Sequence, residues 1–316
     1  MPHWLIKSAV HRTIAWLPAS HFWNSLLQSC FTRSTVLTPA AFETKVKECD
    51  RHLRAFRAIQ PETPNFTVFE LGTGWLPTYP VGLYLCGAGE IWTFDISPLL
   101  KSKRVRQTLQ FFCDYDQRGE LARLLPGLRR ERMEGVRAAL TAPTQESPAG
   151  LLGRLKILPY AADARQTGLP ERSIDFITSS GVLMCIPLEV LKGILAEFGR
   201  LAAPGGVMTH RVNLRDQFSY FDHSITPFNY MRYTEAQWRW RNSPIIWQNR
   251  LLISDFRRLM KEAGFEIAHE ENILGSAAEL AKVKLAPEFQ KYRQEDLLVM
   301  ESLFTAKLNG ATRPCA

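Results

Sequence analysis

Val68-Phe-Glu-Leu-Gly-Thr-Gly74, followed by Ile91-Trp-Thr-Phe-Asp95, decides the fold of this chain. Each stretch begins as a short apolar run, which predicts a buried strand. The first ends in a glycine turn and the second in a carboxylate. In nucleotide-binding α/β units such glycines let backbone approach a ligand, and an acid about twenty residues later accepts hydrogen bonds from ribose hydroxyls. The two stretches therefore predict the first half of such a unit.

The glycine turn departs from a dinucleotide fingerprint at one position. The third small residue of that fingerprint would fall near Leu76 or Pro77, and neither is glycine. Two alternatives therefore stay open at this point: a glycine turn of the kind found in any α/β domain, and an NAD-dependent dehydrogenase with an altered loop.

Strands and helices alternate along the rest of the chain. Apolar runs predict strands at 67–71, 91–94, 155–160, 174–179, 207–212 and 265–268, and residues 296–308 supply a candidate for the last one. Helical spacing predicts helices at 40–58, at 79–86, from Pro187 to the Pro204-Gly-Gly206 turn, and from Ser254 as N-cap to Gly264. This order predicts an α/β fold: a Rossmann-like, doubly wound, mostly parallel sheet covered on both faces.

The predicted domain organisation has two parts. Residues 1–60 form a helical N-terminal cap, including an amphipathic helix at 4–17. Residues 61–316 form the Rossmann-like domain, with a helical insertion at 98–150 and an aromatic substrate-cap segment at 214–250. We interpret the N-terminal helices as capping or packing elements. Pairing in a homodimer and peripheral contact with a membrane are the alternatives.

Composition narrows the class of protein. The 316 residues are 46% hydrophobic and 22% charged, as in globular proteins, and no apolar run reaches the roughly eighteen residues of a membrane span. The N-terminus lacks a secretory signal pattern. The six cysteines are scattered without a C-x-x-C pair, which argues against a metal site and a disulfide framework and indicates the cytoplasm.

The net charge of +8 is unevenly distributed. Residues 1–60 hold 8 Lys and Arg against 3 Asp and Glu, and residues 101–150 hold 10 against 6. A basic surface attracts nucleic acid, anionic lipid or an acidic partner. We favour a solvated basic surface without a specific partner.

Four motifs follow one another across residues 66–212. They are Glu70-Leu-Gly72-Thr-Gly74, then Asp95, then Ala161-Ala162-Asp163, then Ser180-Gly-Val-Leu-Met-Cys-Ile-Pro187 with Glu197-Phe-Gly-Arg200-Leu201 and Pro204-Gly-Gly206. In this order and at these spacings they resemble class I S-adenosylmethionine-dependent methyltransferases. Residues 210–251 are also similar to a bacterial subgroup associated with small-molecule or polysaccharide pathways. Many relatives carry Glu-His where this chain has Met184-Cys185.

The resemblance implies a cofactor, S-adenosyl-L-methionine, which leaves as S-adenosyl-L-homocysteine. It implies roles for seven residues: Glu70 near the methionine end, Gly72 and Gly74 at the close backbone approach, Asp95 on the ribose hydroxyls, Ala162 and Asp163 at the adenine, and Ser180 after strand four. An exposed strand-end acid is the alternative for Asp95, and a turn acid is the alternative for Asp163.

The acceptor site is expected between residues 210 and 250, where aromatic side chains alternate with polar ones. The candidate general bases are His210, His223 and Asp216, and the candidate substrate-binding residues are Arg211, Tyr220, Tyr230, Trp247 and Arg250. The alternatives are a core histidine for His210, an N-cap for Asp216, solvated or structural arginines, and aromatics that form the core of a cap.

The predicted function is transfer of a methyl group to an oxygen or nitrogen of a small-molecule acceptor by in-line displacement. An RNA methyltransferase is one alternative, favoured by the basic insertion and disfavoured by the lack of an N-P-P-Y-like tetrapeptide or a recognised RNA-binding module. A non-catalytic binding or scaffold protein that keeps the fold is the other.

Overall fold

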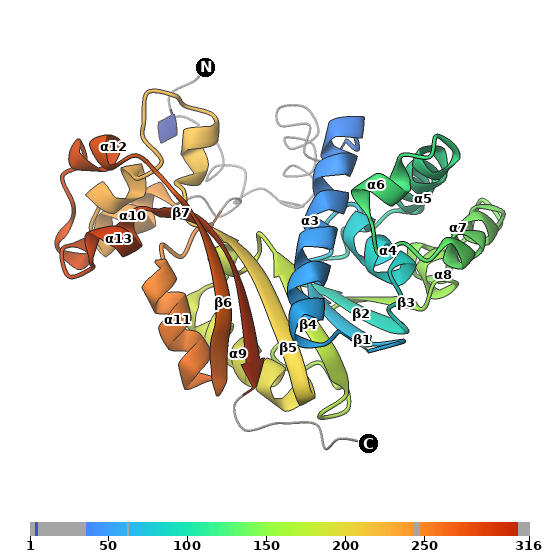
Figure 1. Cartoon of the computed structure of the whole chain (residues 1–316). Coiled ribbons are helices and arrows are strands. Elements are labelled where there is room, and N and C mark those ends of the chain that lie inside the picture. Colours follow the sequence, from blue (N-terminus) through green and yellow to red (C-terminus); the bar gives the residue numbers. More distant parts are fainter. Residues whose placement is uncertain (1–3, 6–35, 62, 243–246, 309–316) are drawn as a thin grey trace.

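The computed structural model describes residues 4–5, 36–61, 63–242 and 247–308. Its centre is a seven-stranded sheet in the order β3-β2-β1-β4-β5-β7-β6 (Figure 1). Neighbouring strands from β3 to β5 pair in parallel, and β7 runs antiparallel to β5 and β6. The strands are β1 (Thr67–Leu71), β2 (Glu90–Asp95), β3 (Ile157–Ala161), β4 (Ile174–Ser180), β5 (Ala202–Asn213), β6 (Phe265–Leu274) and β7 (Val299–Leu308). The predicted doubly wound, mostly parallel α/β sheet is confirmed.

Helices cover both faces of the sheet (Figure 1). The α-helices of the described residues are α3 (Pro39–Ile59), α4 (Thr78–Leu85), α5 (Ser102–Gln117), α6 (Leu121–Leu124), α7 (Met133–Leu140), α8 (Pro148–Gly153), α9 (Leu188–Leu201), α10 (Glu235–Arg241), α11 (Ile253–Glu262), α12 (Ala277–Ala281) and α13 (Gln294–Leu297). Successive strand residues enter opposite cores: Val68 packs with α3, α4 and α5, and Phe69 packs with α9 and α11. No helix in these described ranges is long and apolar enough to cross a bilayer.

Helix α3 belongs to the helical layer that packs on the sheet. The Thr38 hydroxyl caps it by accepting from the Ala41 N–H at 3.2 Å, and Pro39 takes the first helical position. Its apolar residues recur at helical spacing and pack against α4 and β5; they are Phe42, Val46, Cys49, Leu53 and Phe56. The helix predicted at 40–58 is confirmed. Most of the helix predicted at 4–17 lies outside the described residues.

The insertion at 98–150 contains α5 to α7 and the start of α8. Its apolar side chains belong to the same hydrophobic core as those of α3 and α4. Within the insertion, α5 packs against α7 and α8. At the end of the insertion α8 begins at Pro148, where the Ser147 hydroxyl accepts from the Gly150 N–H at 3.0 Å. The insertion therefore covers the β2–β3 end of the sheet (Figure 1).

Three boundaries differ from the sequence prediction. Strand β5 begins at Ala202, so Pro204-Gly-Gly206 lies inside the strand, at the irregular register between β4 and β5 where proline is tolerated. Helix α11 begins at Ile253, not after an N-cap at Ser254, because the Asp255 carboxylate accepts from the Leu252 N–H at 3.0 Å. Strand β6 continues to Leu274, well past the predicted end at 268.

The aromatic segment at 214–250 builds a third core beside the sheet. It contains the short 3₁₀ helices η4 (Gln217–Tyr220) and η5 (Asn229–Arg232), followed by α10. Its buried side chains Phe218, Phe228, Tyr230 and Trp238 pack with residues from α12, α13 and β7, among them Leu280 and Met300. Most of the segment's aromatic area is therefore structural.

Candidate functional site

The glycine turn after β1 is conformationally fixed. Gly72 and Gly74 have φ angles of +88° and +68°, a region that favours glycine. The Gly72 N–H donates to the Phe94 carbonyl at 2.7 Å, which ties the turn to β2. A Cβ on Gly72 would lie 2.3 Å from Val182 Cγ2, so the turn also requires a missing side chain. The chain therefore presents bare backbone at the carboxyl edge of the sheet.

Asp95 ends β2 beside this turn. Its Oδ2 accepts from the Gly74 N–H at 3.0 Å, and its Oδ1 accepts from the Ser97 N–H at 3.2 Å. Burial raises the pKa of Asp95 above its ordinary value, and the backbone N–H groups, Gly74 first, lower it in part. Each carboxylate oxygen retains acceptor capacity for a further donor.

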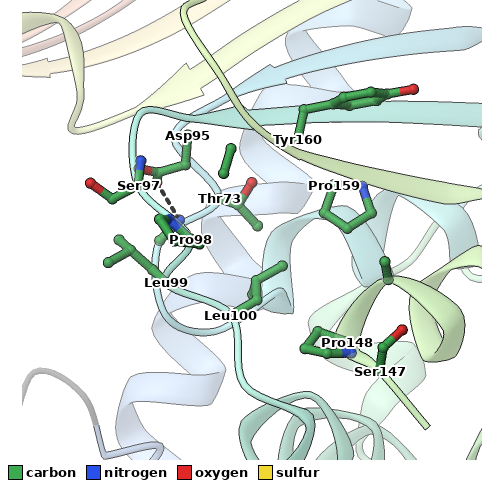
Figure 2. A pocket seen from close by; sticks show the side chains of 13 residues that line it. Thr73, Asp95, Ser97, Pro98, Leu99, Leu100, Ser147, Pro148, Pro159 and Tyr160 are labelled. Carbon is green, nitrogen blue, oxygen red and sulfur yellow. Dashed lines mark hydrogen bonds between the residues drawn. The ribbon is translucent and has the colours of Figure 1, made fainter.

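A cavity of about 200 Å³ opens beside Asp95 (Figure 2). Its lining comes from the glycine turn, the segment after β2, the start of α8 and the end of β3: Thr73, Gly74, Asp95, Ser97, Pro98, Leu99, Leu100, Ser147, Pro148, Ala149, Pro159, Tyr160 and Ala161. Apolar walls with one carboxylate suit a nucleoside, because a flat base needs apolar contact and ribose hydroxyls need an acceptor.

Sequence reasoning identified two of these lining residues, Gly74 and Asp95. It missed the wall formed by Leu99, Leu100 and Pro148. These residues carry no chemical motif, and tertiary packing of the insertion brings Pro148 to a site more than fifty residues from Asp95 in the sequence. The proline that begins α8 was the available local signal.

Glu70 lies on β1 just before the glycine turn and is 4% exposed. The Thr93 hydroxyl donates to its Oε2 at 2.6 Å and also contacts the Thr73 hydroxyl. Burial raises the pKa of Glu70 to about 7, against the lowering effects of the Thr93 hydrogen bond and of Lys45. Glu70 therefore supports the glycine turn through the hydroxyls of Thr93 and Thr73, and its carboxyl group titrates near neutral pH.

Ala162 and Asp163, the residues predicted to contact the adenine, do not line the cavity as Asp95 does. The Ala162 N–H donates to the Asp95 carbonyl at 3.0 Å, and Ala161 lines the cavity. The Asp163 carboxylate is exposed and accepts from Arg165 Nε at 2.9 Å, and this bonding lowers the pKa of Asp163. In the structure its carboxylate is engaged by Arg165 at the surface.

Ser180 ends β4 and meets two charged residues from other elements. Its hydroxyl donates to Oε1 of Glu48 on α3. The same Oε1 lies 3.3 Å from Arg211 Nη1, and Arg211 Nη2 lies 2.5 Å from Oε2 of Glu301 on β7. The structure thus brings the predicted residues Ser180 and Arg211 together. Sequence reasoning missed Glu48, which no local motif marks.

None of the three candidate bases lines the Asp95 cavity. His210 is fully buried: its Nδ1 lies 2.7 Å from the Ser179 hydroxyl, its ring stacks on Phe198, and burial lowers its pKa to about 3. It is a neutral histidine of the core and does not reach the cavity beside Asp95.

Asp216 is also fully buried and has a capping role. Its Oδ1 accepts from the Phe218 N–H at 2.8 Å at the start of η4, and its Oδ2 accepts from Asn229 Nδ2 at 2.9 Å. Burial raises its pKa to about 6. His223 lies exposed on the surface of the aromatic segment.

The candidate substrate-binding residues separate into two sets. Tyr230 is fully buried in the third core, and Arg250 is 7% exposed, binds the Tyr233 carbonyl at 2.6 Å and pairs with Glu235 at 2.5 Å. Both are structural. Tyr220, in contrast, is 46% exposed. Trp247 is half-buried.

Comparison with known proteins gives one match to a family model. Residues 47–270 match a model described as a methyltransferase domain. This range includes β1 to β5, the glycine turn, Asp95 and Ser180. No curated protein matched the sequence.

Several solved structures are similar at low identity. An S-adenosylmethionine-dependent methyltransferase from Mesorhizobium loti is 16% identical, with 83% of this chain and 99% of that chain covered and a TM-score of 0.43. The N-methyltransferase NodS from Bradyrhizobium japonicum, solved with S-adenosyl-L-homocysteine, is 12% identical, with 84% and 88% covered and a TM-score of 0.40. Geranyl diphosphate C-methyltransferase from Streptomyces coelicolor is 10% identical, with 83% and 78% covered and a TM-score of 0.45.

Proposed function

The chain belongs to the class I S-adenosylmethionine-dependent methyltransferases, and on this premise we propose that it methylates an oxygen or nitrogen of a small-molecule acceptor. S-adenosyl-L-methionine is its cofactor and supplies a methyl group on an electrophilic sulfonium. The protein's task is then to hold an acceptor in line with the sulfur–methyl bond and to receive its proton.

The residues present fit this cofactor. The carrying observation is Asp95, a strand-end carboxylate beside a turn of bare backbone and an apolar cavity. We assign the ribose hydroxyls to Asp95, the close backbone approach to Gly72 and Gly74, and the methionine end to the side of Glu70. Leu99 and Leu100 offer apolar contact to the base.

The arginines of the basic insertion favour a small acceptor over RNA. Arg106 donates to the carbonyls of Leu140 and Ala142, both at 3.1 Å, and to that of Pro143. Arg132 donates to the Tyr84 carbonyl at 2.9 Å and to that of Ala88. These two guanidinium groups are engaged by backbone carbonyls, Arg106 within the insertion and Arg132 at the end of α4, which favours a structural role over phosphate binding for both.

The proposed cofactor site is tested by titration calorimetry with S-adenosyl-L-homocysteine. We expect binding by the wild type, a loss of at least tenfold in Asp95→Ala because hydroxyl bonds to a carboxylate are charge-assisted, and unchanged affinity in Glu90→Ala. Glu90 is the matched control because it lies at the opposite end of the same strand. Equal affinity in all three proteins would remove Asp95 from the site.

The acceptor class is tested with S-adenosyl-L-methionine labelled in its methyl group. Purified enzyme is incubated with a cell extract divided into a small-molecule fraction and an RNA fraction. We expect label in the small-molecule fraction. Label that accumulates in the RNA fraction and disappears after ribonuclease treatment would show that the acceptor is RNA and not a small molecule.

A further inference from the structure

Helix α3 is locked onto the sheet by a buried polar contact. His52 is fully buried, and its Nδ1 lies 2.7 Å from the Thr209 hydroxyl of β5 and 3.2 Å from the Thr178 hydroxyl of β4. The Tyr79 hydroxyl lies 2.7 Å from the same Thr178 hydroxyl. Burial lowers the pKa of His52, so the ring is neutral and serves to fix the position of α3.

Glu48 lies one helical turn before His52, on the same face of α3. Because α3 runs opposite to β4 and β5, this step moves toward the carboxyl edge of the sheet. There the Glu48 carboxylate meets Ser180 and Arg211, the residues two positions beyond Thr178 and Thr209. The contact between His52 and the two threonines therefore sets where Glu48 points.

Glu48 is part of a network of charges from four elements. Arg211 also pairs with Glu301, and Arg51 pairs with Glu301 at 3.6 Å and with Glu271 of β6 at 2.8 Å. Three carboxylates share two guanidinium groups, so the network carries one excess negative charge. The side chains of Glu48 and Glu301 are 18% and 17% exposed, so solvent reaches them only in part.

The network adjoins the glycine turn. Leu71 of β1 pairs with Ser179 of β4, and adjacent strands lie about 4.8 Å apart. Val182, two residues after Ser180, packs against Gly72, and the Gly181 N–H donates to the Arg211 carbonyl at 2.9 Å. One strand spacing therefore separates the proposed cofactor turn from the strand end that holds Glu48.

We propose that Glu48 is the catalytic carboxylate that faces the methyl acceptor. Among the described residues, both contacts of this carboxylate fall on Oε1, which leaves Oε2 to accept the acceptor's O–H or N–H. As the acceptor atom bonds to the methyl carbon, its proton passes to Glu48 and the electron pair of the broken carbon–sulfur bond stays on sulfur. Ser180 and Arg211 are positioning residues that hold Oε1, and the inference rests on the proposed function.

The test uses two ligands of defined structure, S-adenosyl-L-homocysteine and sinefungin. Sinefungin carries an ammonium group where the cofactor carries its transferable methyl, so a carboxylate facing that position binds it through a charge-assisted hydrogen bond. Titration calorimetry gives the affinity of each protein for both ligands. We expect Glu48→Gln to weaken sinefungin by about tenfold or more and S-adenosyl-L-homocysteine by less than about twofold.

Two control variants separate position from net charge. Glu301→Gln removes a carboxylate from the same network without touching Ser180, and Glu43→Gln removes one from the same helix, where it accepts from the Tyr115 hydroxyl at 3.0 Å. We expect both to change the ratio of the two affinities by less than about 1.5-fold. An equal loss in Glu48→Gln and Glu301→Gln would reduce the effect to long-range charge and overturn the proposal.

The outcomes also distinguish this proposal from the proposed function. An unchanged affinity ratio in a Glu48→Gln protein that still binds S-adenosyl-L-homocysteine would reject Glu48 alone. Absence of S-adenosyl-L-homocysteine binding in the wild type would reject the assigned cofactor site. If Glu48→Gln fails to fold, Ser180→Ala removes the hydroxyl that orients the carboxylate, and we then expect a smaller but measurable fall in the ratio, about threefold; an unchanged ratio would reject the proposal.

Discussion

The two halves of the sheet's carboxyl edge are held together by different means. At the ends of β1, β2 and β3, backbone N–H groups, a glycine turn and apolar side chains surround Asp95. At the ends of β4 and β5 and the start of β7, long charged side chains from separate elements bind one another. Backbone geometry suits a cofactor shared by a family. Side-chain networks can be changed one residue at a time, which suits an acceptor that differs between members.

The largest effect is expected from Gly72→Ala, which changes the glycine turn in the half of the edge that backbone groups form. A left-handed conformation costs a non-glycine residue about 1–2 kcal/mol, and the overlap with Val182 adds about 1–3 kcal/mol. We expect denaturant unfolding to show a loss of about 2–5 kcal/mol, together with loss of S-adenosyl-L-homocysteine binding. Gly153→Ala is the control because its added Cβ meets nothing within 4 Å. Comparable stability of the two variants would contradict a sterically fixed turn.

The second prediction concerns Glu70, whose pKa burial raises to about 7 from about 4.3 in the unfolded chain. The folded state holds this proton more tightly, so the contribution of Glu70 to stability is greatest below about pH 4 and falls as pH rises toward 7. In Glu70→Gln this fall is absent. Urea unfolding from pH 4.5 to 7.5 should shift the stability difference by about 2–3 kcal/mol in favour of the variant.

The control for this pH series is Glu266→Gln, which removes an exposed carboxylate from β6. Its stability difference from the wild type should stay nearly constant over the same range. A Glu70→Gln profile parallel to that of the wild type would mean that Glu70 is ionised in the folded protein throughout.

The third prediction attacks the side-chain half. Arg211→Met leaves Glu48 and Glu301 facing each other without their shared cation. We expect a loss of about 1–2 kcal/mol, between the values for surface and buried pairs, with S-adenosyl-L-homocysteine affinity changed less than about twofold. Arg137→Met, which breaks the more exposed pair with Asp116, should cost less than about 1 kcal/mol. Loss of cofactor affinity in Arg211→Met would show that the two halves are coupled.

The smallest effect is expected at Asp163. Its carboxylate is exposed and engaged by Arg165, so Asp163→Ala should weaken S-adenosyl-L-homocysteine binding by less than about threefold in calorimetry. If Asp163 made the adenine contact that the resemblance implies, the loss of affinity would be about tenfold or more, because that is the cost of a lost charge-assisted hydrogen bond. A loss of affinity as large as that expected for Asp95→Ala would mean that the turn after β3 also takes part in cofactor binding.

The backbone half could be predicted from the sequence because its signals are local. A glycine turn that follows an apolar run, with an acid at the end of the next run, indicates a nucleotide-binding α/β unit. The strands themselves followed from apolar runs bounded by turns. The proline and glycines at 204–206 misled the prediction of where β5 begins, because an irregular register accommodates them inside the strand.

The side-chain half could not be predicted because it depends on which face each residue occupies. His210 and Arg211 are neighbours on β5, so their side chains point to opposite faces of the sheet. His210 faces Phe198 of α9 in the core, while Arg211 faces Glu48 of α3. The sequence marks both as polar residues at a strand end, and only the packing of α3 distinguishes them.

The start of α8 forms one wall of the cavity beside Asp95, yet it belongs to the connection between β2 and β3 and not to the sheet. The sheet and the wall of the proposed nucleoside site can therefore change independently of each other. A shorter connection, or one of different sequence, would change the shape of the cavity wall while the order of the strands in the sheet stayed the same. Two proteins that share this sheet and this glycine turn can accordingly differ in the shape of this cavity.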